Sequence, residues 1–140
     1  MTLEELIPAV VARIDEIFQP DGLTALAYDD PDYEELHRKA LHDNGVSFSV
    51  AYIHGESVGD PSDLSLKNYV SIVVAEDRPR NQTAKTVYQI AAQCLKGLIA
   101  EDFPGSPSPY LKDDPPIEAE SREDSRLYVY FVNIIANTKN

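Results

Sequence analysis

The residues best able to do chemistry in this sequence are one cysteine, Cys94, and three histidines, His37, His42 and His54. A cysteine nucleophile needs a histidine base beside it in a cleft. Cys94 instead falls on the apolar side of a predicted helix, which is typical of a packed core thiol. The histidines match no zinc-binding spacing, and we interpret them as surface or turn residues.

Acidic residues gather at Asp29, Asp30, Asp32, Glu34 and Glu35, which raises the question of a calcium loop. An EF-hand loop needs a central glycine and a distal bidentate glutamate, and this segment has neither. We interpret the cluster as solvated charge at the start of a helix. The sequence also lacks a glycine-rich phosphate loop and a G-x-S-x-G motif. We therefore predict no catalytic, cofactor-binding or metal-binding residues, and a protein that is not an enzyme.

One basic group, Arg78, Arg80 and Lys85, precedes a predicted helix. The amides at a helix N-terminus favour anions, so a phosphate site is one interpretation. The favoured alternative is that these side chains are loop residues that pair with acidic residues of this chain or of a neighbouring subunit.

Two helices would have to position these residues. The first spans about 2–18, begins with Thr2 and Glu5 in capping-box spacing, and contains Pro8, so it either bends there or starts later. The second covers 83–100 and is the clearest element in the chain. Its apolar residues recur at helical spacing: Ala84, Val87, Ile90, Ala91, Cys94, Leu95, Leu98 and Ile99.

Four strands are predicted, at 46–54, 68–76, 117–120 and 126–137. The last is apolar on both faces and should lie inside the sheet, while 68–76 should be covered on both faces by this chain or by a neighbour. Long polar loops are expected at 55–66 and 101–116. A short helix starting near 30–31 would place Tyr33, Leu36, Ala40 and Leu41 on one face.

These elements predict one domain, residues 1–140, because 140 residues can bury a core of ordinary size. The expected class is α+β, with a mainly antiparallel sheet of about four strands and two helices packed on one face. A single cysteine and the lack of a signal sequence favour a reducing cytoplasm. No apolar stretch is long enough to predict a membrane span.

The net charge of −12 comes from 24 acidic and 12 basic residues. That sign repels phosphate backbones and anionic lipids, so nucleic-acid wrapping and membrane binding are not expected. A solvated acidic surface is the favoured interpretation, and recognition of a cationic partner is the alternative.

Four segments carry a resemblance to a known family: residues 46–55 (VSFSVAYIHG), 69–81 (YVSIVVAEDRPRN), 87–98 (VYQIAAQCLKGL) and 121–137 (SREDSRLYVYFVNIIAN). Their order and character resemble the tail-terminator and tail-completion proteins of long-tailed phages, particularly a Mu-type prophage family. Residues 23–44 depart from that pattern.

The resemblance implies a structural subunit, assembled in the cytoplasm and carried in the virion tail. Such subunits form a ring, commonly of six, that caps the tail tube and docks to the head connector, while DNA passes through as cargo without being bound. No cofactor is implied. The candidate interaction residues are Arg78, Arg80, Asn81, Asp60, Asp63 and Tyr110.

Two other functions remain open. The alternative is an acidic binding protein, of the immunity or inhibitor type, that masks a basic partner. The third is a small hydrolase or nucleotide-handling enzyme, for which the sequence shows no motif.

Overall fold

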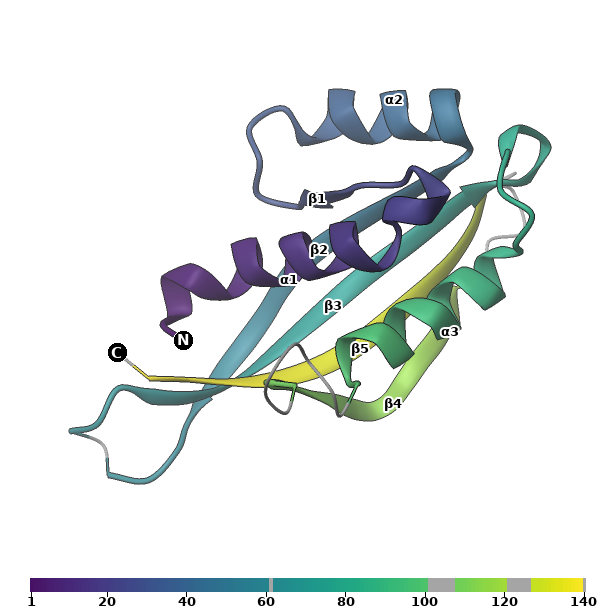
Figure 1. Ribbon diagram of the computed structural model, residues 1–140. Coiled ribbons are helices and arrows are strands. Elements are labelled where there is room, and N and C mark those ends of the chain that lie inside the picture. Colours follow the sequence, from purple (N-terminus) through teal and green to yellow (C-terminus); the bar gives the residue numbers. More distant parts are fainter. Residues whose placement is uncertain (61, 101–107, 121–126, 140) are drawn as a thin grey trace.

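The computed structural model describes residues 1–60, 62–100, 108–120 and 127–139, which form a five-stranded sheet with three α-helices (Figure 1). The sheet order is β1-β2-β3-β5-β4; β1 is parallel to β2 and the other neighbours are antiparallel. The elements are α1 (Leu3–Ile17), η1 (Gln19–Asp21), β1 (Ala25–Ala27), α2 (Tyr33–Asn44), β2 (Val46–Ser57), β3 (Ser65–Asp77), η2 (Arg78–Arg80), α3 (Val87–Leu98), β4 (Tyr110–Glu120) and β5 (Leu127–Lys139).

The α+β class is confirmed, but the predicted sheet of four mainly antiparallel strands is wrong in detail. The missing strand is β1, whose three residues are too few to show a periodic pattern. It pairs with β2 from Ala25↔Phe48 to Ala27↔Val50. The Asp15 carboxylate of α1 accepts a hydrogen bond from the Ala25 amide at 2.7 Å, which holds β1 beside the helix.

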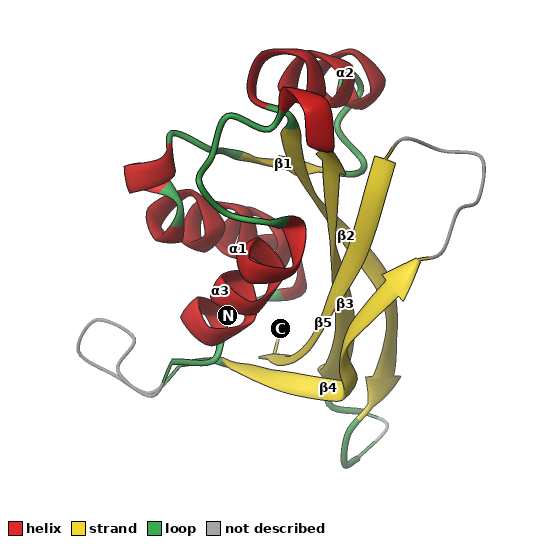
Figure 2. Ribbon diagram, turned by 90° about the vertical axis from the view of Figure 1, so that its right-hand side faces the viewer, coloured by secondary structure: helices red, strands yellow, loops and turns green. Residues whose placement is uncertain are grey.

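Helices α1 and α3 pack together on one face of the sheet, as predicted (Figure 2). The Phe18 ring at the end of α1 lies 4.6 Å from the Phe48 ring of β2. The sheet side of this core comes from alternate residues of three strands, all buried: Val46, Phe48, Val50, Val70, Ile72, Val74, Val132 and Ile134. The predicted alternation in 46–54 is therefore confirmed.

The third helix, α2, covers the opposite face near one end of the sheet. The Tyr33 hydroxyl lies 2.9 Å from Ser49 Oγ, and His37 Nδ1 lies 2.8 Å from Ser47 Oγ. Both serines alternate with Phe48 along β2 and so point away from α1. Burial lowers the pKa of His37, which favours the neutral ring in this contact. The short helix predicted from near 30–31 is therefore present as α2, with Tyr33, Leu36, Ala40 and Leu41 all partly buried, but the predicted architecture of two helices on one face left it out.

The predicted polar loops are shorter than expected. Strand β2 runs to Ser57 and β3 begins at Ser65, so most of 55–66 is a β-hairpin. Strand β4 begins at Tyr110 instead of 117 and includes Pro115 and Pro116, which an edge strand with a register shift tolerates. Residues 101–107 of the predicted proline-rich loop, and 121–126 before β5, lie outside the described residues.

Both predicted helices are present, but their first and last residues differ from the prediction. Helix α1 begins at Leu3 and continues through Pro8, which is exposed, so the helix does not start late. Helix α3 begins after Thr86, whose hydroxyl accepts from the Gln89 amide, so it is shorter than 83–100. Strand β5 lies between β3 and β4, as its two apolar faces predicted.

The core of α3 gives a first prediction. Ile90 is fully buried, whereas Leu95, on the predicted apolar stripe, is only half-buried. Ile90→Asp should destabilise the fold by more than about 4 kcal/mol, because it buries an unpaired carboxylate. Lys96→Asp on the same helix is exposed and should cost less than about 1 kcal/mol. Urea unfolding followed by circular dichroism measures both; a cooperative wild-type-like curve for Ile90→Asp would contradict this core.

Cys94 gives a second prediction. Its thiol is fully buried on α3, and burial raises its pKa to about 12. Because the thiolate is the reactive form, native Cys94 should not react with a thiol reagent at pH 8 except through global unfolding. Ser62→Cys, in the exposed hairpin turn, should label at once. The release of nitrothiobenzoate measures both rates, and rapid labelling of Cys94 in the folded protein would contradict its burial.

Candidate interaction surfaces

The predicted basic residues pair with acids of their own chain. Arg78 Nε lies 3.3 Å from Glu76 Oε1, and its guanidinium lies 3.7 Å from the Tyr128 ring centroid. Glu76 is only 2% exposed and also accepts a hydrogen bond from the Asn81 amide. A buried carboxylate needs such partners, so Arg78 and Asn81 hold the end of β3.

Arg80 and Lys85 also pair with acidic residues of this chain. Arg80 Nε lies 3.6 Å from Asp77 Oδ2, and Lys85 Nζ lies 3.1 Å from Asp21 Oδ1. The favoured interpretation, loop residues paired with acids, is confirmed for pairs within this chain. The turn also packs tightly on Gly45, which has φ +77° and where a Cβ would clash with the backbone of Arg80.

Asp60 and Asp63, two further candidates, lie in the exposed turn between β2 and β3. The Asp60 carboxylate accepts hydrogen bonds from the Ser62 amide and hydroxyl, both at 2.9 Å, and these lower the pKa of Asp60. Asp63 accepts from the Ser65 hydroxyl at 3.1 Å. These bonds shape the turn and leave the carboxylates facing solvent.

Tyr110, the last candidate, lies in the core. It is 2% exposed at the start of β4, opposite Ala136 of β5, and burial raises the pKa of its hydroxyl. The sequence placed it in a loop because the prolines on both sides hid the strand. Tyr110 therefore packs in the core and contributes little to the surface.

Beyond the helices, β2 and β3 continue as a protruding hairpin arm, residues 54–67 with 61 outside the description (Figure 1). The base of the arm is held by a polar network around buried Asn68. The Tyr52 hydroxyl donates to Asn68 Oδ1 at 2.8 Å, and Asn68 Nδ2 donates to Thr138 Oγ1 at 2.9 Å. A Cβ at Gly55 would overlap the Tyr52 hydroxyl, so glycine permits this contact. The arm is thus rigidly attached at its root.

The arm carries exposed apolar side chains. Val58 is 47% exposed and Leu64 is 62% exposed, both in its turn, and Ile53 at its root is 56% exposed. One flank is organised around Tyr69, whose ring stacks on His54 at 4.5 Å and whose hydroxyl donates to Glu56 at 3.2 Å. Such exposed apolar groups on a fixed projection are typical of a contact surface.

A second surface is the part of the sheet that α2 does not cover, which we call the open sheet face. It holds a cavity of about 460 Å³. Asn133 Nδ2 donates to the Pro115 carbonyl at 3.0 Å and to Glu118 at 2.8 Å, which ties the irregular part of β4 to this face. The lining is Ala51, Ile53, His54, Tyr69, Val70, Ser71, Val73, Asp113, Asp114, Pro115, Glu118, Phe131 and Asn133.

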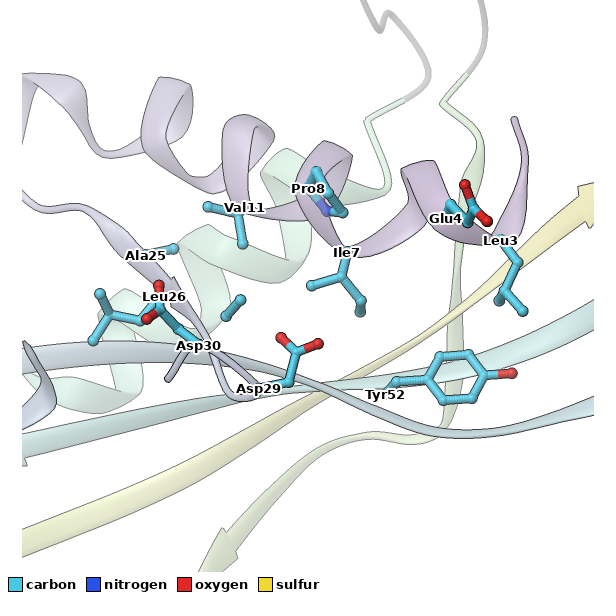
Figure 3. Close-up of a pocket in the computed structure, with 11 residues that line it drawn as sticks. Leu3, Glu4, Ile7, Pro8, Val11, Ala25, Leu26, Asp29, Asp30 and Tyr52 are labelled. Atoms are coloured by element: carbon cyan, nitrogen blue, oxygen red, sulfur yellow. The ribbon is translucent and has the colours of Figure 1, made fainter. Parts of the chain in front are cut away.

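A third surface is a groove of about 610 Å³ between α1 and β1, which we call the α1–β1 groove (Figure 3). Leu3, Ile7 and Val11 of α1 line one side of the groove, Ala25 of β1 lies across from Val11, and Tyr52 of β2 lies at one end (Figure 3). The Asp29 carboxylate points toward Ile7 (Figure 3). The full lining is Leu3, Glu4, Ile7, Pro8, Val11, Ala25, Leu26, Ala27, Asp29, Asp30 and Tyr52, so its charged members are all acidic.

Sequence reasoning missed the groove, because it exists only when β1 pairs with β2. The sole signal was the short apolar run 23–27 before the acidic cluster. Within the described residues, no group of three or more His, Cys, Asp or Glu is placed to hold a metal ion. None of the helices in the described part of the chain is long and apolar enough to cross a membrane. The chain matches no protein-family model and no curated protein.

The Arg78 geometry gives a third prediction, which differs from what a free loop arginine would predict. Arg78→Glu should destabilise the fold by roughly 1–3 kcal/mol, because it removes the cation beside buried Glu76 and adds a second carboxylate. Arg38→Glu, on the exposed side of α2, makes the same charge change and should cost less than about 1 kcal/mol. Thermal unfolding measures both, and equal melting temperatures would contradict a structural role for Arg78.

Proposed function

We propose that this protein is a non-catalytic assembly subunit of the phage tail-terminator type. Its copies form a ring, with six as the number of copies that the resemblance implies, and the ring caps a tail tube and docks to the head connector. The observation that carries the proposal is the protruding hairpin arm. Its turn holds the exposed side chains of Val58 and Leu64. Side chains of this kind become buried when a second surface covers them.

A ring needs two different complementary patches on each subunit. The arm is one, and the open sheet face is the other. Half-buried Val73 and Phe131 offer apolar area on that face, while Ser71 and Asn133 add polar groups. We infer that the arm of one copy lies on the open sheet face of the next copy. The uncovered part of β3 is then covered by a neighbour.

The charge of the chain fits a ring around moving DNA. A subunit with net charge −12 lines a channel with negative potential, which repels phosphates and prevents adhesion. DNA is then cargo and not a ligand. Assembly occurs in the cytoplasm, and the finished ring remains in the virion tail.

Mixing two variants, each defective in one of the two patches, tests the proposed ring. Val58→Asp/Leu64→Asp should disable the arm, and Phe131→Lys should disable the open sheet face, so each variant alone should be monomeric. Their mixture retains one intact arm and one intact face and should give a heterodimer, because a head-to-tail interface needs only one of each. Size-exclusion chromatography with light scattering measures the masses.

Tyr88→Asp is the matched control, because Tyr88 is 58% exposed on α3, away from both patches. This variant should assemble like the wild type, and all variants should melt cooperatively. A wild-type protein that stays monomeric at millimolar concentration and does not bind tail-tube protein contradicts the proposal. Homodimers of either broken variant contradict the head-to-tail arrangement.

The second candidate is an acidic binding protein that masks a basic partner. It is favoured by the α1–β1 groove, whose charged members Glu4, Asp29 and Asp30 are all acidic. It predicts a tight heterodimer that weakens with salt and involves one copy of this chain. Light scattering separates it from the ring by stoichiometry.

A further inference from the structure

The outer edge of β2 is open beyond its short contact with β1. Strand β1 pairs only with Phe48 to Val50, and the Tyr28 amide then donates to the Val50 carbonyl at 2.9 Å. From residue 51 to Ser57, no strand in the described part of the chain pairs with this edge. The backbone groups on this edge are therefore available to an added strand.

The opposite edge of the sheet is protected. Strand β4 carries Asp113, Asp114, Pro115 and Pro116 in its middle, where its pairing with β5 shifts register between Lys112 and Ile117. Prolines, charges and an irregular register prevent an edge from pairing with another chain. The β2 edge has no proline from 51 to 57, and its one register shift, between Tyr52 and His54, leaves His54 to Ser57 in regular pairing with β3, so this edge suits strand addition better than β4.

The α1–β1 groove lies on the helix side of this open edge. Tyr52 belongs both to the groove and to the edge strand, so a strand added beside β2 would project alternate side chains toward Ile7 and Leu3 (Figure 3). The carboxylates of Glu4 and Asp29 border the same space, with no lysine or arginine in the lining. The groove beside the open β2 edge therefore offers both apolar contacts and negative charge to an added strand.

We propose that an extended, positively charged segment of a partner protein adds as a strand to the β2 edge at residues 51–57. Its backbone pairs with β2, its apolar side chains enter the α1–β1 groove, and its lysine or arginine side chains meet Glu4 and Asp29. This is strand addition, in which backbone hydrogen bonds give affinity and side-chain pockets give specificity. The inference goes beyond ring assembly, because the ring uses the arm tip and the open sheet face.

The test uses a synthetic seven-residue lysine–valine peptide with lysine at positions 1 and 7, valine at positions 3 and 5 and threonine between them, so that both kinds of side chain project to the groove side. Its ends are blocked and it carries a fluorophore. Fluorescence anisotropy should show saturable binding that weakens with salt. Hydrogen exchange should show new protection of backbone amides within 51–57. The peptide is tested on the Val58→Asp/Leu64→Asp variant, which should not form rings. Peptide binding is then measured independently of ring assembly.

Matched peptides and variants locate the site. A glutamate–valine peptide should not bind, and one of two peptides N-methylated on alternate residues should fail, because one set of amides must face β2. Glu4→Gln/Asp29→Asn should weaken binding about tenfold at low salt. Glu34→Gln/Glu35→Gln removes the same charge from the exposed side of α2 and should leave binding unchanged.

Three results would overturn the inference. The first is equal binding of the glutamate–valine peptide or of both N-methylated peptides. The second is protection that falls on the open sheet face and not on 51–57. The third is protection of 51–57 that rises with protein concentration without peptide, which would assign this edge to a second copy of the chain.

Discussion

The fold depends on burying one continuous apolar face, formed by alternate residues of β2, β3 and β5, under α1 and α3. The residues at its centre, including Phe48, Ile72 and Val132, are fully buried. Because both long amphipathic helices are needed there, only α2 remains for the opposite face, and it covers just the end near Ser47 and Ser49. The open sheet face is a direct consequence of this unequal distribution of helices.

Polar anchors near the two ends of β3 hold that strand in place. At one end buried Glu76 is satisfied by Arg78 and Asn81, and at the other buried Asn68 is satisfied by Tyr52 and Thr138. Among the described residues, no buried side-chain nitrogen or oxygen lacks a hydrogen-bond partner. Satisfied buried networks select one register, so the arm leaves the sheet in one direction.

Elements with a long repeating pattern could be predicted from the sequence, and surfaces made by pairing could not. The stripe of α3 and the alternation from Val46 to Val50 identify the core directly. Strand β1 has three residues and no period, and Tyr110 was hidden by nearby prolines. The partners of Arg78 were predictable only as a class, because 24 acidic residues are candidates and the fold selects Glu76.

The negative charge near the open edge of β2 affects which chains could pair with that edge. An edge strand without proline can pair with a second copy, and β4 avoids this with Pro115 and Pro116. On the β2 side we infer that charge gives the same protection, because Glu4 and Asp29 border this edge and a second copy would add the same negative charges. That repulsion disappears when the incoming strand is cationic. We therefore infer that negative charge at the β2 edge disfavours self-pairing and favours a basic partner, while the proposed contacts between copies use the arm and the open sheet face.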